Sequence, residues 1–175
     1  MNLVVDLFRT RRSYRNYSEK PIDDAVLKQI MEVGLMSPTG DNLKPVELIL
    51  IKDKDMLNEI ANMRKYGTKM LSHAGAAIIV LVNTQKTDLW IEDGAISASY
   101  MHLAADALGI GSCWIQVRAR DAADGSEFEE KLKEKLDIPE YMKPLCILSL
   151  GNVDHQLPAH SIEDINWDKI HSEKY

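Results

Sequence analysis

Cysteine is scarce in this sequence. Cys113 and Cys146 are the only two among 175 residues, they lie far apart, and neither belongs to a CxxC pair. Small secreted domains held by disulfides use more cysteines than this, and a structural zinc site needs cysteines and histidines clustered at ligand spacing. We therefore expect two buried thiols in a protein of the reducing cytoplasm, rather than a disulfide, and no metal site.

Long hydrophobic runs are also missing. A helix that crosses a bilayer needs about 18–20 apolar residues in succession, and the longest apolar stretch here, Ala74 to Val82, is much shorter. The start of the chain, Met1 to Asp6, has no basic region ahead of a long apolar run and so lacks the pattern of a secretory signal. The sequence predicts no membrane partner, and it predicts a buried strand within the stretch from Ala74 to Val82.

The sequence has fewer basic than acidic residues. The chain has 21 lysines and arginines against 27 aspartates and glutamates, which gives a net charge of −6 at pH 7. An acidic chain repels a polyphosphate backbone at long range, so binding of nucleic acid would need a marked basic patch. After Arg15 the lysines alternate with acids, as in the run from Glu130 to Lys135, which is typical of a solvated helix face. We expect no nucleic-acid partner.

The remaining composition is that of an ordinary globular protein, with 45% apolar and 27% charged residues. A length of 175 residues without repeats or linkers fits one domain over residues 1–175. Apolar spacing and the positions of proline and glycine locate the elements. Helices are expected over residues 3–10, from an N-cap at Asp23 to about Met36, and over 53–65, 89–108 and 126–136, and strands over 46–51, 76–82, 112–115 and 145–150. This order predicts an α+β layered sandwich.

The expected helix over residues 89–108 is unusual because it is rich in Gly, Ala and Ser and poor in charge. Such a helix is covered on most sides, and its small side chains let another backbone approach closely, at the centre of a domain or of a dimer. The tail after Gly151 lacks apolar periodicity, yet it holds Ile165, Trp167 and Ile170. These side chains are expected to dock on another surface, for which a second subunit is one option.

The stretch RRSYRNY, residues 11–17, places three arginines within five residues near the start of an acidic chain. One interpretation is a surface loop whose arginines pair with acids of a neighbouring helix. The other is a cradle for a terminal phosphate, because a guanidinium can hold two phosphate oxygens at once and Ser13 adds a hydroxyl donor. In an extended stretch Arg11, Ser13 and Arg15 leave the backbone on the same side and can converge.

Two further stretches bear on the choice. The loop SPTGDNLKP, residues 37–45, presents Asn42, whose amide both donates and accepts and so suits a heterocycle with adjacent C=O and N–H groups, although an ordinary turn is the other reading. The stretch GIGSCWI, residues 109–115, places small residues beside Trp114, either a ligand wall or a core residue. Neither GxGxxG nor GxxxxGK[ST] occurs, so no dinucleotide or nucleotide-hydrolysing motif is supported. His73 and His102 have apolar neighbours and are expected to pack in the core.

The order and spacing of RRSYRNY, SPTGDNLKP and DGAISASYMHLAADALGIGSCWI, followed by the tail with LPAHS and Trp167, resemble the FMN-dependent nitroreductase family over essentially the whole chain. The resemblance implies a three-layer α-β-α sandwich that forms a homodimer, with two FMN molecules in clefts at the subunit interface. It also implies that this chain's cofactor is FMN, with NADH or NADPH as co-substrate.

The resemblance assigns the flavin contacts to separate segments of the chain. By matching position they are Arg11, Arg12, Ser13 and Arg15 for the phosphate and the pyrimidine side of the ring system, Pro38, Thr39 and Asn42 from the partner subunit, Lys69 near the N1–O2 edge, and Trp114, Ile115 and Gln116 on the strand that crosses the ring. A surface position is the alternative for Lys69. Many family members carry an acidic residue and a glycine where this chain has Gln116 and Val117, so the backbone contact to N5 is an open question.

The chemistry implied by the resemblance belongs to the flavin. NAD(P)H passes a hydride to N5 and leaves, and a small organic acceptor such as a nitroaromatic or a quinone then takes its place, which predicts ping-pong kinetics and no catalytic side chain. The alternatives are a specialised flavin reaction, such as dehalogenation, enoate reduction or flavin breakdown, and a non-catalytic protein that holds flavin. A chain of 175 residues has little room for the substrate lid that the specialised reactions need.

His160 stands at the nearest match to a second phosphate-binding arginine found in many family members. A protonated histidine attracts phosphate and a neutral one does not, so we predict that FMN affinity falls as the pH rises through the range in which histidine loses its proton. A titration of FMN affinity from mildly acidic to mildly basic pH checks this, and a flat profile contradicts it.

Overall fold

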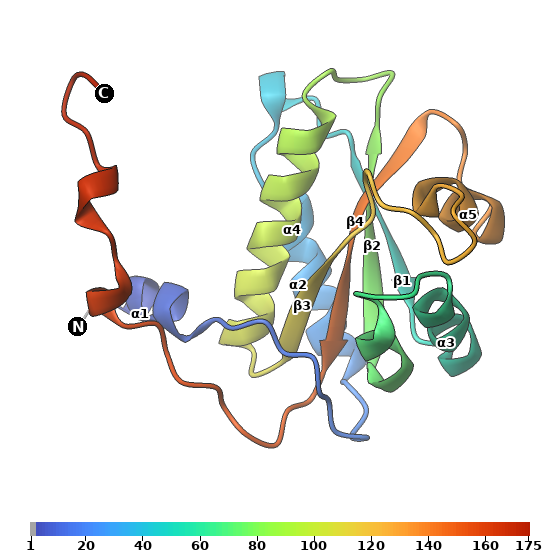
Figure 1. Ribbon diagram of the computed structural model, residues 1–175, viewed down its shortest axis with the longest axis horizontal. Helices are drawn as coiled ribbons and strands as arrows, with labels where there is room; N and C mark the ends of the chain where they lie inside the picture. The colour runs from blue at the N-terminus through green and yellow to red at the C-terminus, as the bar shows by residue number, and fades with distance from the viewer. Residues whose placement is uncertain (1–2) are drawn as a thin grey trace.

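An antiparallel sheet forms the middle layer of the protein in the computed structural model, which describes residues 3–175 (Figure 1). Met1 and Asn2, the first residues of the predicted domain, lie outside the described residues. The sheet has four strands in the order β1-β2-β4-β3. Their bounds are β1 Val46–Ile51, β2 Ala76–Asn83, β3 Gly111–Gln116 and β4 Met142–Gly151. The order leaves β1 and β3 as the two edges.

Strand β2 lies inside the sheet, and every one of its residues is buried, as its apolar run predicts. Because side chains alternate across a strand, the two faces of β2 enter two separate hydrophobic clusters. Ile78, Val80 and Val82 belong to one cluster, and Ile79 and Leu81 belong to the other. A sheet that is apolar on both faces needs helices on both sides.

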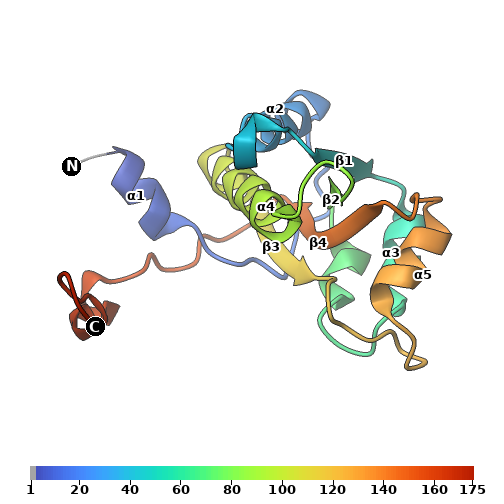
Figure 2. The ribbon, with the colours of Figure 1, turned by 90° about the horizontal axis from the view of Figure 1, so that it is seen from above.

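Two pairs of helices supply this cover, which confirms the predicted three-layer α+β sandwich. Seen from above, α2 (Asp24–Leu35) and α4 (Trp90–Ala107) lie on one side of the sheet, and α3 (Lys54–Asn62) and α5 (Phe128–Lys135) lie on the other (Figure 2). Helix α2 begins where the sequence predicts, because the carboxylate of Asp23 accepts the N–H of Ala25 at 2.8 Å. The predicted elements are all present.

Some boundaries differ from the prediction for identifiable reasons. Helix α3 ends at Asn62 rather than at residue 65, and the chain turns through Gly67 in the left-handed region, at φ 83°. Strand β4 begins at Met142 rather than at residue 145, although Pro144 interrupts its apolar pattern. Pro144 is tolerated there because the pairing of β4 with β2 shifts register beside it.

Helix α4 packs as closely as its small residues predict. A Cβ atom at Gly94 would lie 2.7 Å from Leu145 Cδ2 and 2.9 Å from Val82 Cγ2, so α4 rests directly on the sheet. Ser97, one turn further along the same helix, donates its hydroxyl to the carbonyl oxygen of Gly34 at 2.9 Å, which brings α2 against α4. The small-residue helix therefore lies at the centre of this face of the molecule.

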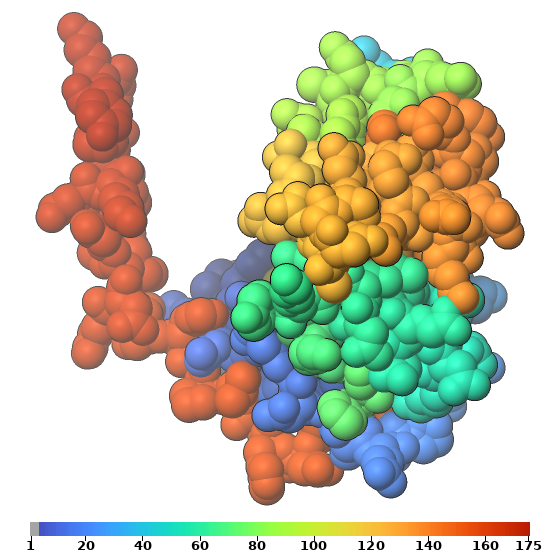
Figure 3. Space-filling view, turned by 45° about the vertical axis from the view of Figure 1, so that its right-hand side comes forward, coloured from blue at the N-terminus to red at the C-terminus, as the bar shows by residue number. Residues whose placement is uncertain are grey.

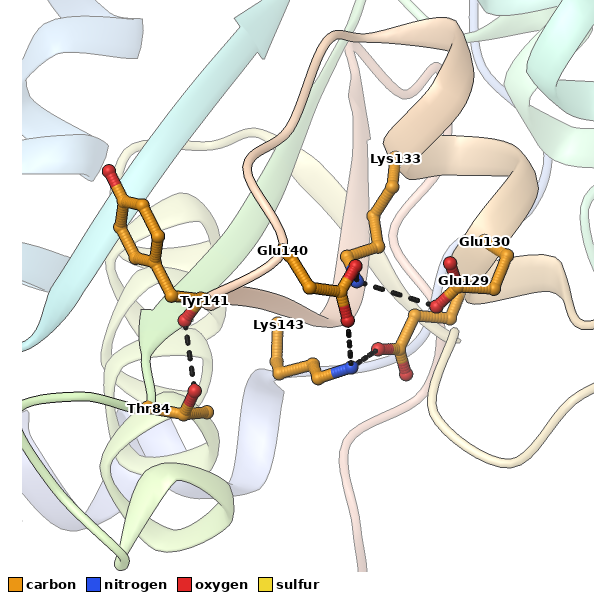
Figure 4. A network of polar contacts seen from close by, with 7 residues as sticks. All are labelled: Thr84, Glu129, Glu130, Lys133, Glu140, Tyr141 and Lys143. Carbon is orange, nitrogen blue, oxygen red and sulfur yellow. Dashed lines mark hydrogen bonds and ion pairs between the residues drawn. The ribbon is translucent and has the colours of Figure 1, made fainter.

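The alternating run of α5 is not wholly the solvated face that the sequence predicts. Lys133 is 5% exposed and pairs with Glu130 at 3.4 Å and with Glu140 at 2.6 Å (Figure 4). Lys143, at the start of β4, pairs with Glu129 at 2.9 Å, and this hydrogen bond raises the pKa of Lys143. A buried ammonium needs such partners, and here they tie α5 to the adjoining end of β4.

Both ends of the chain extend from the same side of the layered body. Helix α1 (Leu3–Thr10) lies beside the C-terminal end of α4 (Figure 1). The tail after β4 extends away from the body and contains two short 3₁₀ turns, Ile162–Asp164 and Trp167–Lys169. The space-filling view shows open space between most of this tail and the rest of the protein (Figure 3). Within residues 3–175, no helix is long and apolar enough to cross a membrane.

Candidate functional site

The arginine-rich stretch forms an arm, residues 11–17, that lies against the beginning of edge strand β3. Ser13 pairs with Ser112 in an isolated parallel bridge, and the N–H of Tyr14 donates to the carbonyl oxygen of Ser112 at 2.9 Å. An edge strand presents unpaired backbone groups, and the arm hydrogen-bonds to one of them, the carbonyl oxygen of Ser112. The rest of the outer edge of β3 stays open to one side of the arm.

Two glycines allow the arm to lie this close to the sheet. Gly111 and Gly151 are register partners on β3 and β4. A Cβ atom on Gly151 would collide with Tyr17 of the arm, and one on Gly111 would collide with Val153 after β4 and lie in tight contact with Tyr14 of the arm. The ring of Tyr14 occupies the space over Gly111, and that of Tyr17 occupies the space over Gly151. The Tyr17 hydroxyl donates to the carbonyl oxygen of Tyr14 at 2.7 Å and shares a hydrogen bond of 2.7 Å with Ser149. Burial raises the pKa of Tyr17, so this hydroxyl keeps its proton.

The arginines of the arm are not compensated by acidic side chains. Within the described chain, Arg11, Arg12 and Arg15 form no ion pair, whereas Arg9, just before the arm, pairs with Asp6 at 3.5 Å. The interpretation of the stretch as a loop paired with the acids of a neighbouring helix is therefore wrong. The three guanidinium charges are available to an anion.

Neutral acceptors hold these guanidinium groups instead. Arg11 Nη1 lies 2.9 Å from Nε2 of His102, Arg15 Nη1 donates to the carbonyl oxygen of Ser13 at 3.3 Å, and Arg12 Nη1 donates to the carbonyl oxygen of Pro158. A neutral acceptor orients an arginine without cancelling its charge. The arm is thus both ordered and cationic.

Two of these guanidinium charges act on Cys113, on β3. Burial raises the pKa of the Cys113 thiol, and the nearby charges of Arg15 and Arg11 oppose this effect. Both guanidinium groups therefore lie close to the first half of β3. Cys113 and Cys146 are free and buried, as the sequence predicts, and burial raises the pKa of Cys146 as well. A buried thiol with a raised pKa is a poor nucleophile, so neither cysteine is a catalytic candidate.

The outer edge of β3 continues past the arm toward Gln116. Arg64 Nη1 donates to the carbonyl oxygen of Gln116 at 3.3 Å, so this carbonyl points to the same outer side as that of Ser112. Backbone groups alternate in direction along a strand, which places those of Trp114 on this side too. The edge from Trp114 to Gln116 can hydrogen-bond a planar heterocycle.

The side chains of this segment are already engaged. Trp114 Nε1 donates to Gln116 Oε1 at 2.9 Å, and Gln116 Nε2 donates to the carbonyl oxygen of Arg118 at 3.0 Å. Trp114 packs partly against the core beside α4, and Ile115 is buried in the core on the other face. The predicted contact of Gln116 with a ligand is thereby limited to its backbone groups. Ile115 offers no such contact at the outer edge, because its side chain is buried and its backbone groups face β4.

Lys69 and the loop after α2 do not reach the arm within one chain. Lys69 is exposed and donates to Asn62 at 3.3 Å, and it is Arg64 that reaches β3. In the loop, Gly40 donates its N–H to Asp93 in the first turn of α4 at 2.9 Å, while Thr10 donates to Asp106 in the last turn at 2.8 Å.

Those two positions on α4 lie about 20 Å apart along the helix axis, at 1.5 Å per residue. Pro38, Thr39 and Asn42 therefore lie at the opposite end of α4 from the arm. Asn42 is nevertheless held in a defined conformation, in the left-handed region at φ 57°, and Thr39 Oγ1 accepts the N–H of Lys44 at 3.1 Å. A strained polar loop of this kind persists only where its surroundings hold it.

The beginning of the tail lies along the arm. Leu157 donates its N–H to the hydroxyl of Tyr14 at 3.0 Å, and His160 donates its N–H to the carbonyl oxygen of Arg9 at 2.9 Å. His160 is therefore brought next to the arginine stretch, as its predicted role requires, with an exposed side chain.

A comparison with known proteins identifies the family. The model of the nitroreductase family matches residues 8–87 and 62–152, which together include the arm, the loop after α2 and all four strands. The chain belongs to the nitroreductase family. This confirms the resemblance seen in the motifs.

Individual relatives match along nearly the whole chain. A protein of Archaeoglobus fulgidus, provisionally named NADH dehydrogenase/NAD(P)H nitroreductase, is 32% identical over 100% of both chains. The NADPH-flavin oxidoreductase of Vibrio harveyi is 25% identical over 98% of this chain and 80% of its own. The solved structure of an FMN-dependent nitroreductase from Clostridium difficile superposes with a TM-score of 0.94, at 34% identity, over 98% of this chain and 99% of that one.

The motifs do not identify two residues of this candidate site. Arg64 contacts the carbonyl of Gln116, and its guanidinium also lies 5.5 Å from the centre of the Phe128 ring. His102 is buried as predicted, but both of its ring nitrogens make polar contacts, with Arg11 and Ser112. Arg64 stands in none of the quoted motifs, and His102 lies within DGAISASYMHLAADALGIGSCWI without a predicted polar contact, because each residue reaches its partner only through the fold. His73, also expected in the core, is exposed instead.

The close packing around the start of β3 can be tested at Gly111. A methyl group in Gly111→Ala would overlap Val153 and lie 3.0 Å from Tyr14 Cβ. We expect the free energy of unfolding to fall by about 1–3 kcal/mol, as for other overpacked sites, and trypsin to cleave the displaced arm faster at Arg11 and Arg12. Denaturant unfolding and limited proteolysis measure the two effects.

The control for this test is Gln85→Ala, at an exposed residue of the turn after β2, away from the arm. This control should change stability by less than about 0.5 kcal/mol. A Gly111→Ala protein as stable and as resistant to trypsin as the wild type would show that the arm does not depend on this contact.

Proposed function

We propose that this protein is an FMN-dependent NAD(P)H oxidoreductase whose arm binds the phosphate of FMN. The observation that carries the proposal is the set of uncompensated guanidinium groups of Arg11, Arg12 and Arg15 beside the open edge of β3. The name of the A. fulgidus relative includes NAD(P)H nitroreductase, and that of the C. difficile structure includes FMN-dependent nitroreductase. Both agree with this assignment.

The residues present fit a phosphorylated ligand. A terminal phosphate carries close to two negative charges and several acceptor oxygens, and arginine can bind two of those oxygens with one planar group. The arm supplies such groups in a chain whose net charge is −6, so the local field differs in sign from that of the whole molecule. Ser13, held against Ser112, adds a hydroxyl donor from the middle of the arm.

The open edge of β3 fits the ring system of the same ligand. The backbone groups of Trp114 and Gln116 point outward along this edge, and Arg64 lies beside its far end. The side-chain amide of Gln116 is engaged by Trp114 and Arg118, so the backbone of this segment makes the contact near N5. FMN held there would supply the redox chemistry, the transfer of reducing equivalents from NAD(P)H to a small acceptor such as a nitroaromatic or a quinone.

The protein's own residues then bind and orient rather than react. Both buried cysteines and the protonated Tyr17 are unsuited to nucleophilic or basic roles at neutral pH, so no side chain of the arm or of β3 is assigned a covalent step. Because reductant and acceptor use the same open side of the site in turn, the kinetics are ping-pong. Lys69 remains a candidate for the N1–O2 edge, which it reaches only with movement from Asn62.

The cofactor and the redox activity can be tested together. We expect the purified protein to bind FMN and turn yellow, anaerobic NADH or NADPH to bleach this colour, and a nitroaromatic or a quinone to restore it. Arg15→Ala should weaken FMN binding by about tenfold or more, because a charged hydrogen bond contributes about 1.5–3 kcal/mol. Equilibrium dialysis and visible spectroscopy measure binding and reduction.

The matched control for this test is Arg9→Ala, which removes an arginine already paired with Asp6 and should leave FMN binding unchanged. Failure of the wild-type protein to bind FMN would contradict the cofactor assignment. Flavin that binds but stays yellow with both nucleotides would identify a flavin-holding protein rather than an oxidoreductase.

We also propose that the working unit is a homodimer. A groove of about 870 Å³ runs between α1, α2 and α4, and most of the side chains that line it are apolar, including Phe8, Met36 and Ile96. Phe8 is 57% exposed and Met36 is 75% exposed, which is unusual for large apolar side chains unless another surface covers them. The extended tail carries Trp167 and Ile170, which are 61% and 67% exposed.

A second copy of the chain suits this surface better than another partner. The loop with Pro38, Thr39 and Asn42 lies at the end of α4 remote from the arm of its own chain, and a second subunit can bring its loop to that arm. The predicted contacts of both segments with one flavin then come from two chains, as the family resemblance implies.

The dimer can be tested with Ile96→Glu, which places a charge in the groove. The wild type is expected to sediment at about twice the chain mass of 19.8 kDa, and Ile96→Glu to sediment as a monomer with weaker FMN binding. Tyr141→Glu is the control, because Tyr141 is similarly exposed but lies before β4, away from the groove. A wild-type protein that sediments as a monomer, or an Ile96→Glu dimer, would contradict this interface.

A further inference from the structure

His102 connects the arm to the interior of the protein. It lies on α4, is 9% exposed, and has a polar partner at each ring nitrogen. Nε2 lies 2.9 Å from Nη1 of Arg11, and Nδ1 contacts the hydroxyl of Ser112 on β3. His102 therefore links α4, on which it lies, to Ser112 of β3 through one ring nitrogen and to Arg11 of the arm through the other.

The chemistry of arginine determines which nitrogen of the ring carries the proton. A guanidinium donates hydrogen bonds and cannot accept them, so Nε2 must offer its lone pair to Arg11. The proton of the neutral ring is then on Nδ1, which donates it to Ser112 Oγ. Burial and, to a smaller extent, the charge of Arg11 together lower the pKa of His102 to about 4. The ring is therefore neutral at neutral pH.

A neutral partner has a particular consequence for Arg11. A carboxylate at this place would hold the guanidinium but would also neutralise its charge, which would reduce its attraction for a phosphate. The imidazole restrains the same group and leaves the full positive charge. Ser112 completes the arrangement, because its hydroxyl holds the ring while its carbonyl oxygen accepts the N–H of Tyr14 at 2.9 Å. One residue of β3 thus positions both the backbone of the arm and the ring behind Arg11.

We propose that His102 is a positioning residue for phosphate recognition, holding the Arg11 guanidinium in the orientation that binds the FMN phosphate through the contact chain Ser112–His102–Arg11. This inference rests on the proposed function, since it assumes that the arm binds FMN. It differs from a packing role, because a packing residue affects the folded state as a whole, whereas a positioning residue acts on the phosphate alone.

Riboflavin separates these two roles, because it has the ring system of FMN without the phosphate. The experiment compares dissociation constants for FMN and riboflavin in the full-length wild type, His102→Gln and His102→Asn. The glutamine amide reaches the place of Nε2 and can accept from Arg11, whereas the shorter asparagine amide reaches only the place of Nδ1 and contacts Ser112. The two amides are similar in polarity, so the pair of variants separates the contact with Arg11, which glutamine keeps, from the contact with Ser112, which asparagine keeps.

We expect His102→Asn to lower the preference for FMN over riboflavin by about tenfold, the loss of one oriented charged contact, while riboflavin affinity stays near the wild-type value. His102→Gln should keep the preference within about threefold of the wild type. In the Arg11→Ala background, His102→Asn should cause no further loss, because the contact it removes is already absent. His73→Asn, at an exposed histidine, is the matched control and should bind both flavins as the wild type does.

The possible results separate this inference from the proposed function. A wild type with no preference for FMN over riboflavin would overturn the phosphate-binding role of the arm, and this inference with it. A wild type that prefers FMN, combined with an unchanged preference in His102→Asn, would overturn the role of His102 alone. Equal losses of FMN and riboflavin affinity in His102→Asn, or losses that add to those of Arg11→Ala, would assign His102 to packing.

Discussion

The docking of the arm on the edge of β3 is the contact on which the rest of the site depends. It is a short interaction, a single bridge between Ser13 and Ser112, and it is possible because Gly111 and Gly151 leave room for two tyrosine rings. The same contact satisfies part of the edge strand and leaves the rest open. The position of every guanidinium group in the arm follows from it.

The arginines of the arm keep their positive charge because their hydrogen-bond partners are neutral. Within the described chain, the arginines of the arm are held by carbonyl oxygens and an imidazole instead of carboxylates. Each of these partners limits the motion of an arginine and leaves its charge for an anion. By contrast, the buried ammonium of Lys133 is surrounded by glutamates, and that network joins α5 to β4. In one chain, paired charge thus joins two elements of the fold, and charge without acidic partners lies in the arm to which we assign phosphate binding.

The elements of the fold were predictable because their patterns are local. The apolar run of β2, the N-cap Asp23 and the small residues of α4 each act within a few positions, and the structure confirms all three. Predictions were poorer where a distant residue decides the outcome. Pro144 is accommodated by a register shift against β2, and Lys133 is buried because Glu140, beyond the end of its helix, reaches it.

The sequence by itself determined the class of fold, the family and the arm as the cationic segment, since composition and motif order are properties of the chain alone. Only the tertiary structure decided that the arginines lack acidic partners, that Arg64 rather than Lys69 lies at the end of β3, and that His102 stands behind Arg11. It also placed the loop with Asn42 and the arm at opposite ends of α4. The physical reason is that a hydrogen bond depends on distance in space, and residues far apart in sequence become neighbours only when the sheet and α4 have assembled.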